Sequence, residues 1–194
     1  MAQQQLRADA ERNRRRILDA AAELFAEKGL SVGLDEIARH AGVGVGTAYR
    51  RFASKDELVE ALFEQRISQV AELAEQALEV EDPWEAFSSV LWTGAEIMAA
   101  DRALSEVFAS IPGAMESAMP TVEGLTDTMS KLIARAQAAG VLRADMIVDD
   151  VPMVMCGIGS ATKKEHRCAG AWRRHLSIVL DGLRADSASG PLPS

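Results

Sequence analysis

The stretch that decides the fold is residues 34–58, which read LDEIARHAGVGVGTAYRRFASKDEL. Apolar residues in this stretch recur three and four positions apart, which is the period of a helix with one buried face. We predict a short helix over 34–40, ended by Gly42 in the left-handed conformation that glycine adopts without steric cost. A second short helix is predicted over 45–52.

The same period continues on both sides of this stretch, and the alternation typical of strands is absent, so we predict an all-α protein of about nine helices. Ser54 and Glu57 have the spacing of a capping box, and Asp82 followed by Pro83 is a typical helix start. The further helices are expected over 9–28, 54–80, from 83 onward, 101–108, 120–139 (closed by Gly140), 148–162 and 169–184.

Charge is unevenly distributed along the 194 residues. The net charge is −8, but residues 1–63 hold ten Lys/Arg and ten Asp/Glu, so the whole deficit lies in residues 64–194. A protein needs only a local basic face to approach nucleic acid, so residues 1–63 are candidates and the remainder is not. No apolar run reaches the ~18 residues of a membrane-spanning helix, no secretory signal is seen, and two cysteines make no disulfide framework. We therefore expect a cytoplasmic protein that does not associate with membranes.

Two short helices joined by a glycine-containing turn, after a longer helix, are typical of a helix-turn-helix unit, whose second short helix enters the DNA major groove. In that helix Val45, Ala48, Tyr49 and Phe52 are expected to point inward. Ala48 and Phe52 share the inner face, which leaves the outer face for DNA. Arg50 is the candidate for reading guanine, because a guanidinium pairs with O6 and N7 through two hydrogen bonds. The other candidates for DNA contact are Arg12, Arg14, Arg15 and Arg16 at flanking phosphates or the minor groove, Gly46 for close backbone approach, Thr47, Tyr49 and Lys55 at phosphates, and Arg51 on the same outer face.

At these residues the chain resembles the TetR family of bacterial transcription regulators. The resemblance runs through ILDAA at 17–21, LFAEKG at 24–29, LDEIA at 34–38, AGVGVGT at 41–47, YRRF at 49–52 and SKDEL at 54–58. It implies a homodimer that represses transcription at an inverted-repeat operator and releases the DNA when a small molecule enters its C-terminal domain. Gly33 stands where the family usually has a hydroxyl residue that touches phosphate, so here a backbone N–H would make that contact. Gly44 and Ile147 likewise stand where hydroxyl caps of later helices are expected.

Beyond residue 63, three runs resemble the C-terminal domain of an actinobacterial-type subgroup of this family. They are DPWEA at 82–86, RAQAAGVLRAD at 135–145 and LDGLR at 180–184. The expected domains are an N-terminal arm with a helix-turn-helix DNA-binding domain over 1–54, a helical ligand-binding and dimerisation domain over 55–186, and a disordered tail over 187–194, which is rich in Ser, Pro and Gly.

Eight methionines beside only nine aromatic residues predict a soft interior that can rearrange around a largely apolar small molecule. Ile111-Pro112-Gly113 is expected to break a helix and open an entrance. The candidate pocket residues are Trp84, Phe87, Trp92, Met98, Phe108, Met115, Met119, Met129 and Met153. The last two helices are expected to pair across a two-fold axis as a four-helix bundle. The candidate interface residues are Val154, Ile158, Ala161, Trp172, His175, Leu176, Val179, Leu180 and Leu183.

Other functions of the same residues were weighed against this hypothesis. The run GVGVGT at 42–47 resembles a phosphate-binding glycine loop, but such a loop follows a strand and here a helix precedes it. His166 and Cys168 lack the paired spacing of a zinc site, and Cys156 is favoured as an apolar core residue over a redox sensor. His175 is favoured as an interface residue over a catalytic base, and no nucleophile motif occurs, so we expect no enzyme, metal or cofactor. The alternatives are a ligand-independent regulator, an interaction module without DNA, and an all-α enzyme.

Overall fold

The computed structural model describes residues 2–100, 112–161 and 170–193. Within these ranges the regular structure is helical, apart from one β-bridge that joins Leu142 to Arg184. The eight α-helices of the described ranges are α1 (Ala2–Lys28), α2 (Leu34–His40), α3 (Val45–Arg51), α4 (Lys55–Ala77), α5 (Pro83–Ala100), α7 (Pro112–Ala138), α8 (Asp150–Ala161) and α9 (Ala171–Leu183). This confirms the all-α prediction, while the helix expected over 101–108 lies outside the described residues.

The chain divides into two compact units, and the division falls inside α4. The first unit comprises the residues up to Gln65 together with the first turns of α7, as far as Ala118. The second comprises Arg66–Ala100 and the residues from Met119 onward. The first unit therefore extends past the boundary expected at residue 54.

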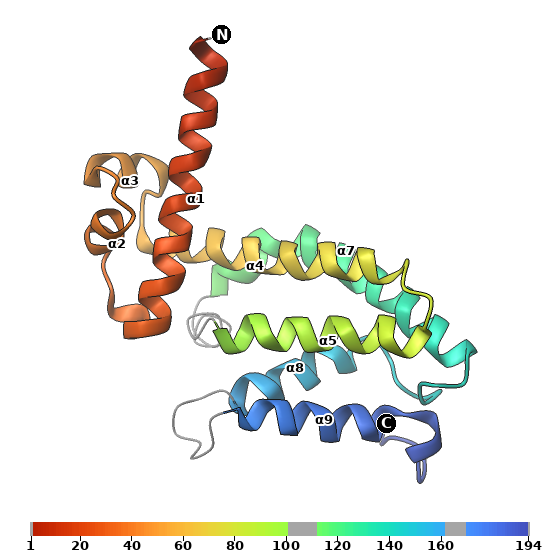
Figure 1. Ribbon diagram of the computed structural model, residues 1–194. Coiled ribbons are helices and arrows are strands. Elements are labelled where there is room, and N and C mark those ends of the chain that lie inside the picture. The colour runs from red at the N-terminus through yellow and green to blue at the C-terminus, as the bar shows by residue number, and fades with distance from the viewer. Residues whose placement is uncertain (1, 101–111, 162–169, 194) are drawn as a thin grey trace. The chain divides into compact units, whose positions relative to one another are not determined.

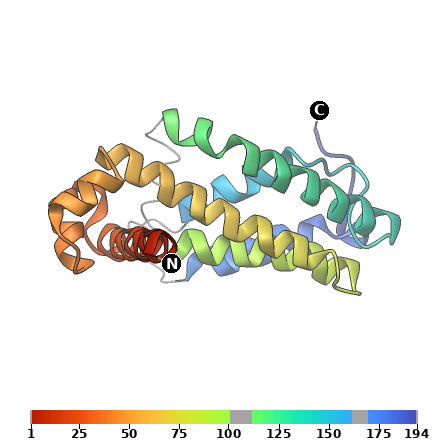
Figure 2. The same cartoon turned by 90° about the horizontal axis from the view of Figure 1, so that it is seen from above.

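In the first unit α2 and α3 pack beside α1, and Figure 1 shows the N-terminal part of α1 extending past them. Ile17 and Phe25 on α1, Ile37 on α2, and Ala48 and Phe52 on and just after α3 are almost completely buried. These apolar side chains hold α3 in place from its inner side, so its outer face is free of core packing. Figure 2 looks along α1 and shows α2 and α3 on one side of it.

Two glycines end helices of the first unit, and one of them, Gly42, does so as predicted. Gly29, with φ of 72°, follows α1, and Gly42, with φ of 63°, follows α2. Both adopt the left-handed conformation that side chains with a Cβ avoid. α1 begins at Ala2 instead of the predicted Asp9, because residues 2–8 hold good helix formers and neither proline nor glycine.

Side-chain caps begin α4 and α5 as the spacing predicted. The backbone N–H of Glu57 donates to the Ser54 hydroxyl at 3.1 Å, and the Glu57 carboxylate accepts from the N–H of Ala53 at 2.6 Å. The Asp82 carboxylate accepts from the N–H of Glu85 at 2.8 Å. These bonds satisfy backbone donors that have no partner inside their own helix.

The core of the second unit is formed by α5, α7, α8 and α9 with the end of α4. Phe87 and Leu91 on α5, Leu132 on α7, Ile158 on α8 and Leu176 on α9 are among its fully buried members. Figure 1 shows α5, α8 and α9 side by side, and each of the three contacts the other two.

Arg135 on α7 binds the backbone that follows α4. Its Nη1 donates to the carbonyl of Leu78 at 2.7 Å, and its Nη2 donates to the carbonyl of Val80. A cation is favourable at the C-terminal end of a helix, where carbonyl groups lack intrahelical partners. Arg135 thus connects two helices that are far apart in the sequence.

The predicted start of α7 is wrong. The helix begins at Pro112 rather than at Pro120, so Pro112 and Gly113 lie in its first turn. Proline has no N–H to lose in a first turn, and its fixed φ suits a helix start. Residues 101–111 lie outside the described residues, so the entrance expected here stays a prediction.

The last two helices begin slightly later than predicted. α8 starts at Asp150, whose carboxylate accepts from the N–H of Ile147 at 2.9 Å. This bond satisfies the N–H of Ile147, which lies before the helix, and so does not replace the hydroxyl cap that Ile147 lacks. α9 starts at Ala171, after Gly170 with φ of 79°.

The C-terminal tail, expected to be disordered, is instead held by hydrogen bonds to the loop after α7. The N–H of Leu192 donates to the Asp145 carboxylate at 2.7 Å, and Arg143 Nη2 donates to the carbonyl of Gly190 at 2.8 Å. Figure 2 shows this tail beside that loop. The contacts join residues 47 positions apart, which no local sequence signal reveals.

None of the helices in the described ranges is both long and apolar enough to cross a bilayer. The described residues likewise contain no cluster of His, Cys, Asp and Glu suited to a metal ion. His166 and Cys168 lie outside them.

Candidate nucleic-acid interface

The outer face of α3 carries the side chains that were predicted to contact DNA. Arg50 is exposed and Ala48 is buried, as predicted. Val45 and Tyr49, which were expected to point inward, are instead exposed at 36% and 49%, so that part of the prediction is wrong. Arg50 Nη2 donates to the Thr47 hydroxyl at 3.2 Å. The face is therefore partly ordered before any nucleic acid is bound.

Tyr49 is tied to α2 through its phenol. Its side chain is 49% exposed, and a hydrogen bond to the Asp35 carboxylate, together with the charge of that carboxylate, raises the pKa of Tyr49. This bond uses the one O–H donor of the phenol. Tyr49 must therefore release Asp35 before it can donate to a phosphate oxygen, so the predicted phosphate contact stays a prediction.

Three cations around α3 are held by the scaffold. The Arg14 guanidinium lies 5.9 Å from the centroid of the Phe52 ring, and the Lys55 ammonium lies 5.8 Å from the centroid of the Phe25 ring. Both distances allow attraction between the charge and the ring face. Arg16 Nη2 donates to the carbonyl of Gly42 at 3.3 Å, so Arg16 supports the turn between α2 and α3.

The remaining predicted contacts lie on the same unit. Arg15 is exposed and Arg51 is half-buried. Gly33 precedes α2 in an extended conformation without a side-chain cap. A Cβ added at Gly33 or Gly46 would meet no atom within 4 Å, so neither glycine is required by packing inside the protein.

The predicted pocket residues divide into three groups. Phe87 and Met129 are buried core residues, and Trp84, Trp92 and Met98 are half-buried. Met119 and Met153 are exposed, at 40% and 68% of their surface. Phe108 lies outside the described residues, and the Met115 side chain is not described.

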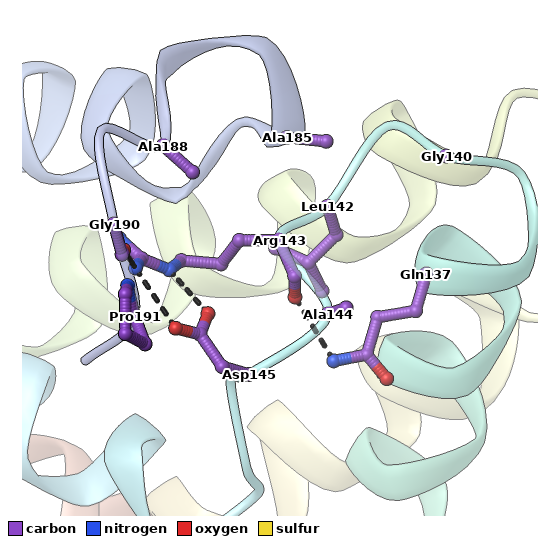
Figure 3. A pocket seen from close by; sticks show the side chains of 10 residues that line it. All are labelled: Gln137, Gly140, Leu142, Arg143, Ala144, Asp145, Ala185, Ala188, Gly190 and Pro191. Atoms are coloured by element: carbon purple, nitrogen blue, oxygen red, sulfur yellow. Dashed lines mark hydrogen bonds and ion pairs between the residues drawn. The ribbon is translucent and has the colours of Figure 1, made fainter. Parts of the chain in front are cut away.

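A surface hollow of about 460 Å³ lies elsewhere, between the loop after α7 and the C-terminal tail. Figure 3 shows Arg143 reaching across it to the tail, with Asp145 beside its guanidinium and Gln137 pointing at the Arg143 carbonyl. Arg143 Nε donates to the Asp145 carboxylate at 2.6 Å. This bond and the one from Leu192 hold the pKa of Asp145 well below its usual range. Sequence reasoning missed these residues, because the pairing depends on the fold of the tail.

Most of the predicted interface residues are buried in their own chain. Ile158, Trp172, Leu176, Leu180 and Leu183 all belong to the core of the second unit. This burial corrects the expected interface, since a side chain inside its own core has little surface left for a partner. Three predicted interface residues do reach the surface of α8 and α9: His175 is exposed, and Val154 and Val179 are half-buried. Met153, Cys156 and Ile178 are exposed on the same two helices.

Comparisons with known proteins agree with this geometry. Residues 17–62 match the family model described as bacterial regulatory proteins of the tetR family, and residues 82–185 match the SbtR-like transcriptional regulator C-terminal domain. The crystal structure of a TetR transcription regulatory protein from Mycobacterium vanbaalenii is 35% identical, with a TM-score of 0.69 over 92% of this chain and 99% of that one. The regulator FadR from Bacillus subtilis, in complex with stearoyl-CoA, has a TM-score of 0.65 at 19% identity over 87% of this chain and 98% of that one.

A curated relative, the helix-turn-helix transcriptional regulator SrpR from Pseudomonas putida, is 41% identical over 80 residues. The match spans 41% of this chain and 38% of the relative's length. The first match lies within the first compact unit and covers the helix-turn-helix, and the second match covers the C-terminal helices and lies mostly within the second unit. The chain therefore belongs to the TetR family of helix-turn-helix transcription regulators, with an SbtR-like C-terminal domain.

Proposed function

We propose that this protein is a cytoplasmic repressor that binds a palindromic operator as a homodimer and is released by a largely apolar small molecule. The observation that carries the proposal is the exposed outer face of α3, where Arg50 and Tyr49 stand on a fully buried apolar scaffold. An exposed arginine on a recognition helix suits the major-groove edge of guanine.

The DNA-binding part of the proposal separates base reading from phosphate binding. Arg50→Ala should weaken binding to the preferred duplex by about 1–3 kcal/mol and relax the sequence preference at one position. Lys55→Ala should weaken binding to all sequences and reduce the slope of log affinity against log salt by about 1. The test is to select duplexes from a random pool with the purified protein, and then to titrate both variants against the selected and a scrambled duplex. Equal losses on both duplexes for both variants would contradict these roles.

The dimer is proposed to form through the exposed faces of α8 and α9. Met153 and Ile178 are large apolar side chains exposed at 68% and 59%, and burial of both in a dimer would remove apolar surface from water. His175 lies beside Gly157 on the neighbouring helix, since a Cβ added at Gly157 would be 3.6 Å from His175 Nε2. Dimeric helix-turn-helix proteins bind two half-sites about one helical turn of DNA apart, so a two-fold dimer predicts an inverted-repeat operator.

A matched pair of variants tests the dimer. Ile178→Glu should produce a monomer in sedimentation and lose affinity for the palindromic duplex. Ile147→Glu is the control, because Ile147 is exposed to nearly the same extent, 58%, but lies before α8. A dimer that survives Ile178→Glu would refute this interface.

The ligand part of the proposal rests on the adaptable side chains around α5. Trp92 and Met98 are half-buried, and a Cβ added at Gly94 would be 3.2 Å from Met155 Cε on α8. Methionine side chains adapt readily to a bound apolar molecule. The Bacillus subtilis protein with this fold binds stearoyl-CoA, which supports an organic ligand for the fold and does not identify the ligand of this chain.

Release requires that the ligand bind better to a state with low DNA affinity. The proposed link is α4, which begins in the first unit and continues in the second. A compound screen that measures both thermal stabilisation and release of the selected duplex tests this link. A compound that stabilises the protein but leaves the affinity for the duplex unchanged would favour the alternative, a ligand-independent regulator.

A further inference from the structure

Thr47 and Arg50 form a bonded pair on the outer face of α3. Arg50 Nη2 donates to Thr47 Oγ1 at 3.2 Å, and the two residues are one helical turn apart. Because Thr47 is half-buried and Arg50 is exposed, the pair anchors a mobile guanidinium to a more fixed hydroxyl. We propose that Thr47 is a positioning residue that aims Arg50 at a base, a role that rests on the proposed DNA-binding function.

Thr47 is the side chain of α3 best placed for this task. On a helix, a residue contacts the side chains three and four positions before it. For Arg50 these positions are Thr47 and Gly46, and Gly46 has no side chain. The positions three and four after Arg50 lie beyond the end of α3 at Arg51. The hydroxyl of Thr47 is therefore the restraint that the helix itself provides.

The bond leaves both partners able to contact DNA. Arginine carries five N–H donors, so the bond to Thr47 leaves four, including those that a guanine edge needs for two hydrogen bonds. Thr47 accepts this bond through its oxygen and retains its own O–H donor. The arrangement thus allows Thr47 to bind a phosphate while it holds Arg50.

Restraint of Arg50 acts on sequence preference more than on affinity for DNA in general. A free arginine can swing to a phosphate on any sequence, whereas a held guanidinium reaches only the base edge in front of it. Ordering a long side chain beforehand also lowers the entropy lost on binding. Loss of the hydroxyl should therefore lower the ratio of affinities for the selected and the scrambled duplex by about three- to tenfold.

The test compares Thr47→Val, which keeps the shape but removes the hydroxyl, with Thr47→Ser, which keeps the hydroxyl. Thr47→Ala is a second variant without the hydroxyl, and circular dichroism verifies the fold of each. Affinities for the duplex selected from a random pool and for its scrambled form are measured at several salt concentrations. We expect Thr47→Val and Thr47→Ala to lower the ratio and Thr47→Ser to preserve it.

The coupling to Arg50 decides between a positioning residue and a simple phosphate ligand. In an Arg50→Ala background, removal of the Thr47 hydroxyl should no longer change the ratio. If the variants without the hydroxyl instead lose equal affinity for both duplexes and flatten the salt slope, as expected of Lys55→Ala, Thr47 binds phosphate only and the inference is overturned. If the wild-type protein prefers no duplex, the proposed function itself fails.

Discussion

Replacement of Gly42 by alanine tests whether the turn between α2 and α3 depends on a left-handed residue. Gly42 has φ of +63°, and the left-handed conformation costs a residue with a Cβ about 1–2 kcal/mol. The added Cβ would also be 2.7 Å from Arg16 Nη2, so the guanidinium must move and its 3.3 Å bond to the Gly42 carbonyl is lost. The smaller freedom of alanine in the unfolded chain offsets part of this cost. We expect a net destabilisation of the first unit by about 1–2 kcal/mol.

Hydrogen exchange measures this loss where it occurs. The amides of Gly42 and Val43 donate to the carbonyls of Arg39 and Ala38, at 3.1 and 3.0 Å, so their exchange reports on the turn. A loss of about 1–2 kcal/mol corresponds to exchange that is about 5–30 times faster. The amides of α9, in the second unit, serve as an internal reference.

Gly33→Ala is the matched control for Gly42→Ala. Gly33 has φ of −88°, and an added Cβ would meet no atom within 4 Å. The smaller freedom of alanine in the unfolded chain favours the variant, whereas Gly33 is the N-cap of α2, where alanine is less favourable than glycine, so we expect a net change in stability below about 1 kcal/mol. If the two variants exchange at the same rate, the turn does not need a left-handed residue and the reasoning is refuted.

Three further predictions concern single side chains. Gly46→Ala should stabilise the first unit by up to about 1 kcal/mol in thermal melts, because glycine disfavours helix. The same variant should bind DNA more weakly in titrations, because the added Cβ would stand where the DNA backbone is expected to approach α3 closely. Equal DNA affinities of the variant and the wild type would contradict that close approach. Arg135→Met should destabilise the protein by about 1–3 kcal/mol and lower its melting temperature, because the carbonyls of Leu78 and Val80 beyond α4 lose their hydrogen-bond donor. Lys131→Met is the control, because Lys131 is exposed and its replacement should leave the melting temperature unchanged. The pKa of Asp145 is lower in the folded state than its ordinary 3.8, so its contribution to stability is present above about pH 4 and declines as the pH falls below that value. Asp145→Asn should therefore lower the melting temperature at neutral pH, and in acid its melting temperature should approach that of the wild type. A difference in melting temperature that stays constant with pH would argue against the Arg143 bond as the source of the stabilisation.

Much of the helix-turn-helix was predictable from short-range signals. Gly42, the Ser54–Glu57 capping box and the Asp82 cap all act on backbone groups no more than five residues away. Such bonds form wherever the local sequence allows them, so the pattern alone located α2, α3 and the starts of α4 and α5. The same helical period predicted that Ala48 lies on the inner face of α3 and Arg50 on the outer face. In the structure Ala48 is buried and Arg50 is exposed.

Whether an apolar helix face of the second unit packs in its own core or faces a partner chain could be decided only from the tertiary structure. The stripe of Trp172, Leu176 and Leu180 on α9 is equally suited to a dimer interface and to the core of its own chain. Only the packing of α9 against α5 and α8 shows that these side chains are buried within the chain, so that Ile178 remains outside.

Long-range contacts explain the other differences. Arg143 and Asp145 hold Gly190 and Leu192, and Arg135 holds carbonyls more than 50 residues away. Hydrogen bonds between residues so far apart leave no periodic trace in the sequence, because their geometry exists only after the helices have packed. Local sequence signals therefore located the helices of the helix-turn-helix. The partners of the α9 apolar face and of Arg135, Arg143 and Asp145 could be identified only from the packed structure.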